Sequence, residues 1–308
     1  MSCNICGSGN AVFFLKCADF EFREKQVELS KCGSCGTIFV NPLPPDKELS
    51  GYYRGNYYEK PGFIFGIIQG LRKVFFSGIT PGKVLDVGCG AGTFLKTMKN
   101  LGWECSGIEV SESSKKFTRK LKSQGIDVKY GDLLKADYKK NSFGLITFWH
   151  VVEHLKKPGL YLERANELLK KGGLLFIAVP NIDSFSFRLW KSNWFHLDVP
   201  RHLNHFSPGT ISALVEKNGF RVVKISHYSF EFNPFGVLQS LYNSLGFEFD
   251  FLYKLMKKKP VKTGASYYLQ LSLTLITLPV MAPLSTALAY LFSLAGRGDT
   301  IQVLAEKH

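Results

Sequence analysis

The stretch that most constrains the fold of this chain is an apolar run that ends in an acid and is followed by three glycines. It reads Val84-Leu85-Asp86-Val87-Gly88-Cys89-Gly90-Ala91-Gly92. A buried strand that enters a tight turn and then a helix has this pattern. Glycine has no Cβ, so the turn can be sharp and its backbone can approach a ligand closely. The spacing is Gly-x-Gly-x-Gly, because Thr93 stands where a dinucleotide fingerprint has its third glycine. A plain strand-to-helix turn is the alternative interpretation.

From Lys83 onward, strand patterns alternate with helical patterns such as Leu160–Lys170 and Pro208–Asn218. This alternation predicts an α/β fold with a mostly parallel, doubly wound sheet. Ligands of such sheets bind at the carboxyl ends of the strands. The expected strands are Val84–Val87, Glu104–Glu109, Ile126–Tyr130, Leu145–Trp149, Leu174–Val179, Val222–His227 and Thr300–Leu304.

Acids stand at the ends of the first three of these strands. Glu109 closes the second strand, and Gly131-Asp132-Leu133 follows the third. With Asp86 and the glycine loop, they resemble the motifs of class I S-adenosylmethionine-dependent methyltransferases. The resemblance implies a Rossmann-like seven-stranded sheet whose last strand is antiparallel. It also implies a cofactor site formed by Asp86, Gly88, Cys89, Gly90, Gly92, Glu109, Asp132, Leu133 and His150.

The resemblance assigns a role to each acid. Glu109 would accept hydrogen bonds from both ribose hydroxyls, because a carboxylate offers two acceptor oxygens. Asp132 would accept from the adenine amino group, and the loop at Asp86 and Gly88 would hold the methionine amino group. Each acid taken alone is also common at a strand end.

Four of the seven histidines lie in two clusters, after the fourth strand and in the segment 198–206. An imidazole with a pKa near neutrality can remove a proton from a hydroxyl during methyl transfer. His150 is the first choice for this base. The alternative for His154 is to bond the backbone and orient Glu153, and for His202 and His205 it is to order the loop. The candidate catalytic residues are His150, Glu153, His154, His202 and His205.

A metal-assisted reaction is a further interpretation of the same residues. His150, Glu153, His154 and His205 resemble the set with which small-RNA 3′-end methyltransferases and some quinone methyltransferases hold a divalent ion. Two imidazoles and a carboxylate can bind such an ion and acidify a coordinated hydroxyl.

The motifs around the reaction site point to the class of acceptor. Glu153-His154-Leu155 and Val179-Pro180-Asn181 resemble small-molecule and lipid methyltransferases, including the ubiquinone-biosynthesis O-methyltransferases. The cysteine pairs and double tyrosines resemble sugar and polysaccharide-locus methyltransferases. Enzymes that methylate nucleobase amines usually carry Asn/Asp-Pro-Pro-aromatic after the fourth strand, where this chain has His150 to Leu155.

Two Cys-x-x-Cys pairs precede the methyltransferase motifs, Cys3 with Cys6 and Cys32 with Cys35. Four thiolates in two such knuckles can close a tetrahedral zinc site. With no histidine and no open position, the site is interpreted as structural, in a zinc-ribbon-like module that cannot bury a core of its own. Reduced surface thiols are the alternative, and Cys17 is expected to be buried.

An aromatic linker joins this module to the main domain, and its Tyr52, Tyr53, Tyr57 and Tyr58 either line the cleft or pack the module. A short helix is expected over Phe63–Phe76. The expected division is 1–45 for the zinc module, 46–80 for the linker, 81–229 with 299–308 for the methyltransferase domain, and 230–298 for an apolar helical insertion before the last strand.

The insertion has no charged residue from Thr263 to Gly296. Pro279 and Pro283 interrupt it, leaving two apolar pieces that are each shorter than a spanning helix. Basic residues flank both ends, so both ends are expected to face the cytosol. A re-entrant or interfacial helical hairpin at a membrane fits this pattern, and a helical pair that packs on protein is the alternative.

The chain has 308 residues and a net charge of +14, which favours an anionic partner such as a membrane surface or nucleic acid. Simple solubility would also account for the charge. No signal peptide is visible at the start, so a cytoplasmic protein is expected, at the inner face of the membrane if the insertion binds lipid.

We expect methylation, most readily O-methylation, of a small-molecule, sugar or lipid-linked acceptor, with S-adenosylmethionine and structural Zn²⁺ bound. The competing functions are an RNA methyltransferase whose zinc module binds RNA and a non-catalytic module that binds the cofactor. Nucleic acid is disfavoured by the motif after the fourth strand. The sequence does not indicate an oligomeric state.

Overall fold

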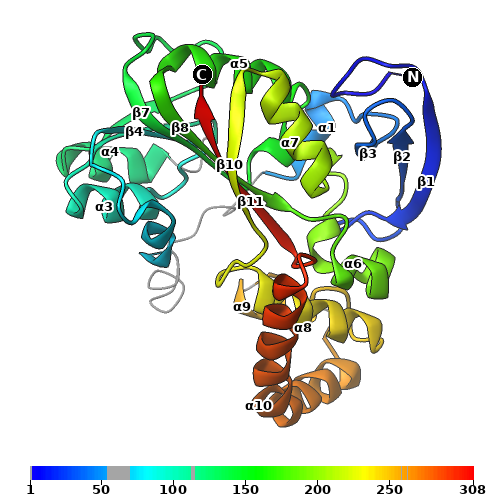
Figure 1. Ribbon diagram of the computed structural model, residues 1–308. Coiled ribbons are helices and arrows are strands. Elements are labelled where there is room, and N and C mark those ends of the chain that lie inside the picture. The colour runs from blue at the N-terminus through cyan, green and yellow to red at the C-terminus, as the bar shows by residue number, and fades with distance from the viewer. Residues whose placement is uncertain (1, 54–69, 112–114, 258, 262) are drawn as a thin grey trace.

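The computed structural model describes residues 2–53, 70–111, 115–257, 259–261 and 263–308. Its largest element is a seven-stranded sheet with the order β10-β11-β8-β7-β4-β5-β6 (Figure 1). This sheet confirms the predicted Rossmann-like, doubly wound α/β fold. The strands are β4 (Lys83–Val87), β5 (Glu104–Glu109), β6 (Asp127–Tyr130), β7 (Phe143–Trp149), β8 (Leu169–Pro180), β10 (Phe220–Ser226) and β11 (Thr300–Lys307).

Helices cover both faces of this sheet, because its central strands are apolar on both sides. In β8, Leu175, Ile177 and Val179 pack on one face with α5 (Pro158–Leu168) and α7 (Pro208–Lys217). Phe176 and Ala178 point to the other face, toward α3 (Thr93–Asn100) and α4 (Lys115–Ser123). Both faces of β8 are therefore buried, as the apolar run in its sequence predicts.

The last strand lies inside the sheet rather than at its edge. β11 pairs antiparallel with β8, with Ile301 opposite Val179, and antiparallel with β10, with Ala305 opposite Val222. The prediction of an antiparallel seventh strand beside the sixth is therefore confirmed. All the residues between β10 and β11 must leave the sheet and return at the same end.

A second, four-stranded sheet has the order β1-β2-β3-β9. β1 (Ala11–Ala18), β2 (Gln26–Cys32) and β3 (Ile38–Val40) come from the N-terminus, whereas β9 (Asn204–His205) comes from the segment 198–206. Their shared core includes Leu29 from β2 and Trp194 from the main domain, and Cys17 is buried in it as predicted. The N-terminal module thus shares its sheet with the chain that follows β8.

The linker supports both interpretations of its tyrosines. Tyr52 follows α1 (Asp46–Gly51), and its ring packs on Phe20 and Phe22 of the N-terminal module. Tyr53 instead reaches His154 in the main domain. Tyr57 and Tyr58 lie outside the described residues, and of the expected helix over Phe63–Phe76 the described part is a 3₁₀ helix, η1 (Leu71–Phe76).

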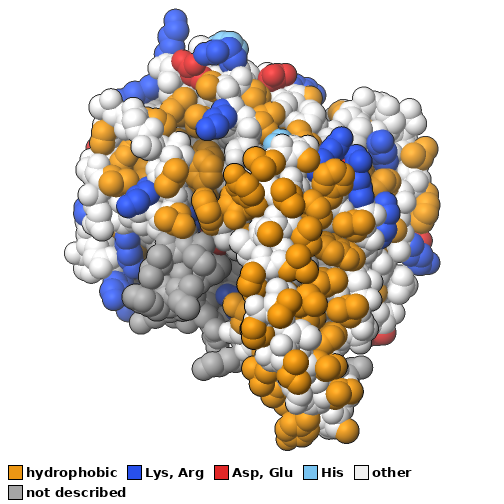
Figure 2. All heavy atoms as spheres, turned by 60° about the horizontal axis from the view of Figure 1, so that its bottom comes forward, with side chains coloured by type: hydrophobic (Ala, Val, Ile, Leu, Met, Phe, Trp, Pro, Cys, Tyr) orange, Lys and Arg blue, Asp and Glu red, His pale blue; other side chains and the backbone are white. Residues whose placement is uncertain are grey.

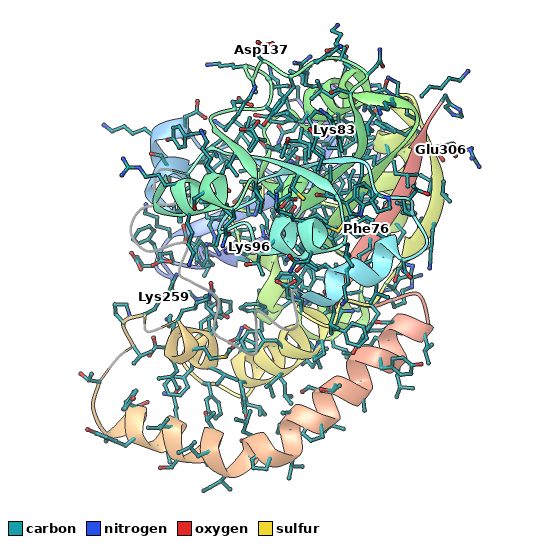
Figure 3. All side chains as sticks on the ribbon, turned by 90° about the vertical axis from the view of Figure 1, so that its left-hand side faces the viewer. Phe76, Lys83, Lys96, Asp137, Lys259 and Glu306 are labelled. Carbon is teal, nitrogen blue, oxygen red and sulfur yellow. The ribbon has the colours of Figure 1, made fainter. Side chains whose placement is uncertain are left out.

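The insertion differs from the expected hairpin of two short apolar helices. It consists of α8 (Asn233–Ser244), α9 (Phe251–Met256) and one long helix, α10 (Ala265–Leu294), with Pro279 and Pro283 inside it. The prolines stand four residues apart, so the backbone hydrogen bonds that they remove lie on one face of the helix. A helix bends at such a place without ending, and Figure 3 shows α10 bent beneath the body.

The remaining helices are short. They are α6 (Phe185–Trp190), η3 (Val152–His154), η4 (Lys191–Asn193) and η5 (Phe195–Leu197). The carboxyl ends of the parallel strands and the insertion lie at the same end of the molecule, the lower end in Figure 1.

Candidate functional site

The glycine loop after β4 adopts backbone conformations that require glycine. Gly88, Gly90 and Gly92 have φ values of 72°, 51° and 71°. A Cβ on Gly88 would come within 2.6 Å of Val151 Cγ2, and one on Gly92 within 2.5 Å of Leu121 Cδ1. The turn therefore forms as the glycine pattern predicts, and it leads directly into α3.

The acids predicted for the cofactor site lie at the ends of three neighbouring strands. The buried Glu109 carboxylate accepts hydrogen bonds from the N–H groups of Gly90 (2.9 Å) and Ser111 (2.8 Å), so it ties β5 to the glycine loop. Asp132, after β6, accepts from the N–H of Leu134 at 3.0 Å. The fold thus brings the predicted acids to one edge.

Asp86 lies within the same edge, at the end of β4, and is buried. Its Oδ1 accepts a hydrogen bond of 2.7 Å from the Thr147 hydroxyl. Burial raises the pKa of Asp86 to about 7, although the Thr147 hydrogen bond and the nearby Arg72 lower it. Asp86 is therefore poised between its charged and neutral forms near neutral pH.

His150 directly follows β7 and has an unusual backbone for a residue with a side chain. Its φ is 53°, in the left-handed region, and its N–H donates to the carbonyl of Ala178 (2.9 Å) in β8. Strained residues of this kind cluster at functional sites. The conformation turns the imidazole against the ring of Phe232, with 4.1 Å between the ring centroids.

The contacts of His150 leave one ring nitrogen available. Its Nδ1 lies 3.2 Å from Glu153 Oε1. When Glu153 is ionised, its carboxylate only accepts, and in that state Nδ1 carries the proton and Nε2 bears the lone pair. Nε2 is buried and has no hydrogen-bond partner among the described residues. Burial lowers the pKa of His150 to about 4, so the ring is neutral at neutral pH.

A compact group of possible metal ligands is formed by Glu153, His154 and His202. One donor atom from each lies within 4.8 Å of the others. Nδ1 of His154 donates to the carbonyl of Arg201 (3.0 Å), and Nδ1 of His202 to the carbonyl of His196 (2.9 Å). Each histidine therefore keeps the lone pair on Nε2, the arrangement typical of metal-binding histidines.

The protonation of this group follows from its burial. Burial lowers the pKa of His154 and of His202, so both rings are held neutral. Burial raises the pKa of Glu153 to about 7, and its Oε2 has no hydrogen-bond partner within the described part of the chain. The site has spare acceptor capacity for a cation or a proton.

The structure does not gather the metal set expected from the sequence. His205 lies on β9 and pairs with Ile38 of β3 in the small sheet, with its ring centroid 6.3 Å from that of His202. His202 takes the place expected for His205, because pairing of β9 fixes the direction of the side chains around it.

Sequence reasoning missed several residues that border the site. Arg72 stacks over the ring of Trp149 (4.4 Å to the centroid) and makes two hydrogen bonds of 2.9 Å to Glu231. Phe232 covers His150, and its ring lies 6.3 Å from that of His196, whose Nε2 is buried. Arg72 precedes the glycine loop and Glu231 begins the insertion, so no local motif signalled their contact.

The four N-terminal cysteines converge as predicted. The Sγ atoms of Cys3 and Cys35 lie 3.6 Å apart, as do those of Cys6 and Cys32, and all four lie within 4.8 Å of one another. Ligands of tetrahedral zinc at the usual 2.3 Å lie about 3.8 Å apart. The donor set therefore fits zinc, with Gly7 and Gly36 at φ values of 77° and 75° closing the two turns.

The thiols of the cluster differ in how readily they ionise. Burial raises the pKa of Cys3 to about 12. For Cys32, burial also raises the pKa, but hydrogen bonds from backbone and cysteine groups outweigh it and lower the pKa to about 6.

A family model described as "Methyltransferase domain" matches residues 63–225, more than half of the chain. The chain is also similar to the ubiquinone biosynthesis O-methyltransferase of Caulobacter vibrioides, with 32% identity over 118 residues that cover 37% of this chain and 45% of the relative. The enzyme of the same name from Pelagibacter ubique is 28% identical over 159 residues, which cover 48% and 65%. The chain thus spans less than two thirds of the length of these relatives.

Solved structures with the same fold have little sequence in common with this chain. Phosphoethanolamine N-methyltransferase 2 of Haemonchus contortus, solved with S-adenosylmethionine, matches with a TM-score of 0.50 and 17% identity, covering 87% of this chain and 58% of that one. A chain from the complex of a methyltransferase with its Trm112 activator, from Haloferax volcanii, matches with a TM-score of 0.52 and 12% identity, covering 85% and 95%.

The glycine loop, the acids at successive strand ends, the strand order and the family match agree. The chain belongs to the methyltransferase-domain family and is a class I S-adenosylmethionine-dependent methyltransferase.

Proposed function

We propose that this enzyme methylates a hydroxyl group of a small-molecule, sugar or lipid-linked acceptor, with His150 as the general base. The observation that carries the proposal is the state of His150 at the end of β7. Its Nδ1 faces Glu153, and its buried Nε2 has no hydrogen-bond partner among the described residues. The names of the curated relatives, which are O-methyltransferases, support a hydroxyl as the acceptor.

The cofactor, when bound, supplies a methyl group activated by its positive sulfonium. In our proposal Asp86, the glycine loop, Glu109, Asp132 and Leu133 hold it at the edge formed by β4, β5 and β6. His150 Nε2 would accept the proton that the acceptor hydroxyl loses when its oxygen takes the methyl group, and the demethylated cofactor, S-adenosylhomocysteine, would be the leaving group. The ionised Glu153 then stabilises the imidazolium through the Nδ1–H group.

A second mechanism is favoured by the convergence of Glu153, His154 and His202. In it, these three residues hold a divalent cation, which would acidify an acceptor hydroxyl. The orientation of both histidines by backbone carbonyls supports this alternative. His202→Ala separates the two mechanisms, because only the metal mechanism predicts that it removes a bound ion.

We also propose that Cys3, Cys6, Cys32 and Cys35 bind one structural zinc ion. The convergence of their Sγ atoms supports the assignment. This proposal includes the division of the chain into a zinc module, a linker, a methyltransferase domain and an insertion. It also includes a cytoplasmic location.

The test uses the purified full-length enzyme, a membrane extract as the source of acceptor, and a cofactor that carries a labelled methyl group. We expect label in the lipid or the sugar fraction, in a base-stable ether rather than in RNA or protein. Loss of a general base typically lowers the rate about 10²–10⁴-fold. We therefore expect His150→Ala to lower the rate of methyl transfer by about this factor. His308→Ala, at the exposed C-terminus, is the matched control.

Two results would contradict the proposal. Label in RNA would contradict the proposed acceptor and would support the competing function, an RNA methyltransferase. Normal turnover by His150→Ala, His154→Ala and His205→Ala would show that the assignment of the base to these histidines is wrong. Metal analysis of His154→Ala and His202→Ala, with zinc counted separately, reports on the metal mechanism.

A further inference from the structure

The long helix of the insertion exposes an unusual amount of apolar surface. Figure 2 shows hydrophobic side chains gathered over the insertion on the face turned to the viewer. Within the described residues, α10 is the helix that is long and apolar enough to cross a membrane, and little of it is buried. Its most exposed large apolar side chains are Tyr268, Leu269, Leu275, Ile276, Val280, Tyr290, Leu291 and Leu294.

The polar side chains of α10 do little to make it compatible with water. The hydroxyls of Thr274, Thr277, Thr286 and Ser293 donate to backbone carbonyls four residues earlier, at distances of 2.8, 2.6, 2.9 and 2.7 Å. Hydroxyls bonded in this way present few free polar groups to the surroundings. α10 is in effect apolar on all sides, which is typical of a helix buried in protein or lipid.

The helix is nevertheless held along its length by the rest of the insertion, namely α8 and the loop between α8 and α9. Near its start, Gln270 Oε1 accepts from the N–H of Glu248 at 2.6 Å. In the middle, the Thr277 hydroxyl lies 2.9 Å from that of Tyr242. Near its end, Ser293 lies 3.1 Å from Asn233 Nδ2.

These contacts decide how the helix can meet a bilayer. Residues 270 and 293 stand about 35 Å apart along a helix that rises 1.5 Å per residue, more than the roughly 30 Å hydrocarbon core. A helix that crossed the bilayer alone would have to separate from α8 and the loop after it over most of this length. The bend at Pro279 and Pro283 instead lets α10 follow α8 while its outer sides stay exposed.

Basic and aromatic residues mark both ends of the helix. Lys254, Lys257 and Lys259 precede it, and Figure 3 labels Lys259 on this segment. At the other end, Arg297 follows the helix, and Arg188 and Lys191 belong to the neighbouring segment, where Phe185 packs on Phe292 at 5.3 Å. Lysine and arginine attract anionic headgroups, and Tyr268 and Tyr290 suit the interface between lipid and water.

We propose that α10 docks on an anionic lipid bilayer as a monotopic helix, with its outer sides in the lipid and both ends at the same surface. The carboxyl ends of the sheet strands lie at the same end of the molecule (Figure 1). The insertion also supplies Phe232, which covers His150. The docked enzyme thus turns its reaction site toward the membrane surface, where an acceptor with a lipid tail would be presented.

The test is flotation of the full-length protein with two kinds of vesicle, phosphatidylcholine alone and phosphatidylcholine with phosphatidylglycerol. We expect strong binding to the anionic vesicles, weakened by added salt. Leu275→Asp with Ile276→Asp should lower the bound fraction at least about tenfold. The matched control is Val12→Asp with Val223→Asp, two exposed apolar residues on β1 and β10, which should bind as the unaltered protein does.

Three outcomes would overturn the proposal. One is the absence of vesicle binding. If the protein is then a dimer that the α10 substitutions dissociate, a second copy of the chain covers the helix. Another is binding that the α10 substitutions leave unchanged. The third concerns topology. Cysteines placed at Ala265 and Ala295 are treated with a maleimide that cannot cross the bilayer. Labelling of just one of the two ends would mean that the helix spans the bilayer. Cofactor binding by the same variants verifies their folding, so the membrane proposal can fail without the methyltransferase assignment failing.

Discussion

The chemistry of the site depends on which ring nitrogen of each histidine carries the proton. For His154 and His202 this is decided by backbone carbonyls, those of Arg201 and His196. For His150 it is decided by Glu153. In all three, the arrangement leaves Nε2 with its lone pair. The sequence located the histidines, but the partner of each ring comes from a turn that only the fold creates.

The glycine loop gives the clearest prediction at the scale of one residue. Gly88→Ala places a Cβ in the left-handed region and against Val151. Left-handed backbone costs about 1–2 kcal/mol for a residue with a Cβ, and the clash adds to that cost. We expect cofactor binding to weaken at least tenfold, measured by calorimetry, and the melting temperature to fall.

Gly78→Ala is the matched control, because Gly78 also has a positive φ (84°) but nothing lies within 4 Å of its added Cβ. It should show the backbone strain alone and bind the cofactor normally. Equal effects of the two substitutions on binding would mean that the loop tolerates a side chain and is not packed against a ligand.

At the scale of elements, the small sheet of β1, β2 and β3 is completed by β9, a strand from a distant part of the chain. β9 adds to β3 through Asn204 and His205. The cysteine cluster itself buries little apolar surface, with Phe39 as its one large buried side chain among the described residues. A metal is therefore expected to supply the stability that this corner lacks.

We predict that Cys6→Ser or a strong chelator removes one zinc ion per chain. The melting temperature should fall by at least about 5 °C, since about 1 kcal/mol shifts it by 2–4 °C in a domain of this size. Proteolysis should then cut near residues 4–10 and 33–37. Cys17→Ser, in the same sheet but away from the cluster, should keep its zinc; retention of zinc and of the melting temperature by Cys6→Ser would refute the assignment.

At the scale of the whole molecule, the ion pair between Arg72 and Glu231 joins η1, which precedes β4, to the start of the insertion. The two side chains are only 13% and 5% exposed, and the nitrogen and oxygen atoms lie 2.7 Å apart. Breaking a buried pair is costly, because it leaves a charge in a site of low polarity. The pair therefore helps to hold the insertion over the reaction site.

Arg72→Gln is expected to lower the free energy of unfolding by about 3 kcal/mol. Glu231→Gln in the same chain should restore part of the loss. Arg221→Gln removes an exposed pair with Glu306 and should cost less than about 1 kcal/mol. Denaturant titration measures all three, and an equal cost for the Arg72 and Arg221 substitutions would show that the inner pair does not hold the insertion.

The sequence by itself determined the α/β class, the seven strands and the edge of the sheet at which Asp86, Glu109 and Asp132 lie. These features are local: apolar periodicity defines a strand, and glycine adopts the backbone at Gly88, Gly90 and Gly92 without strain. Tertiary structure alone decided that His202 rather than His205 joins Glu153 and His154, and that α10 bends at its prolines without ending. It also decided that Arg72 and Phe232 border the site. Such contacts join residues far apart in the chain, and packing of whole elements, rather than any local pattern, determines which side chains meet.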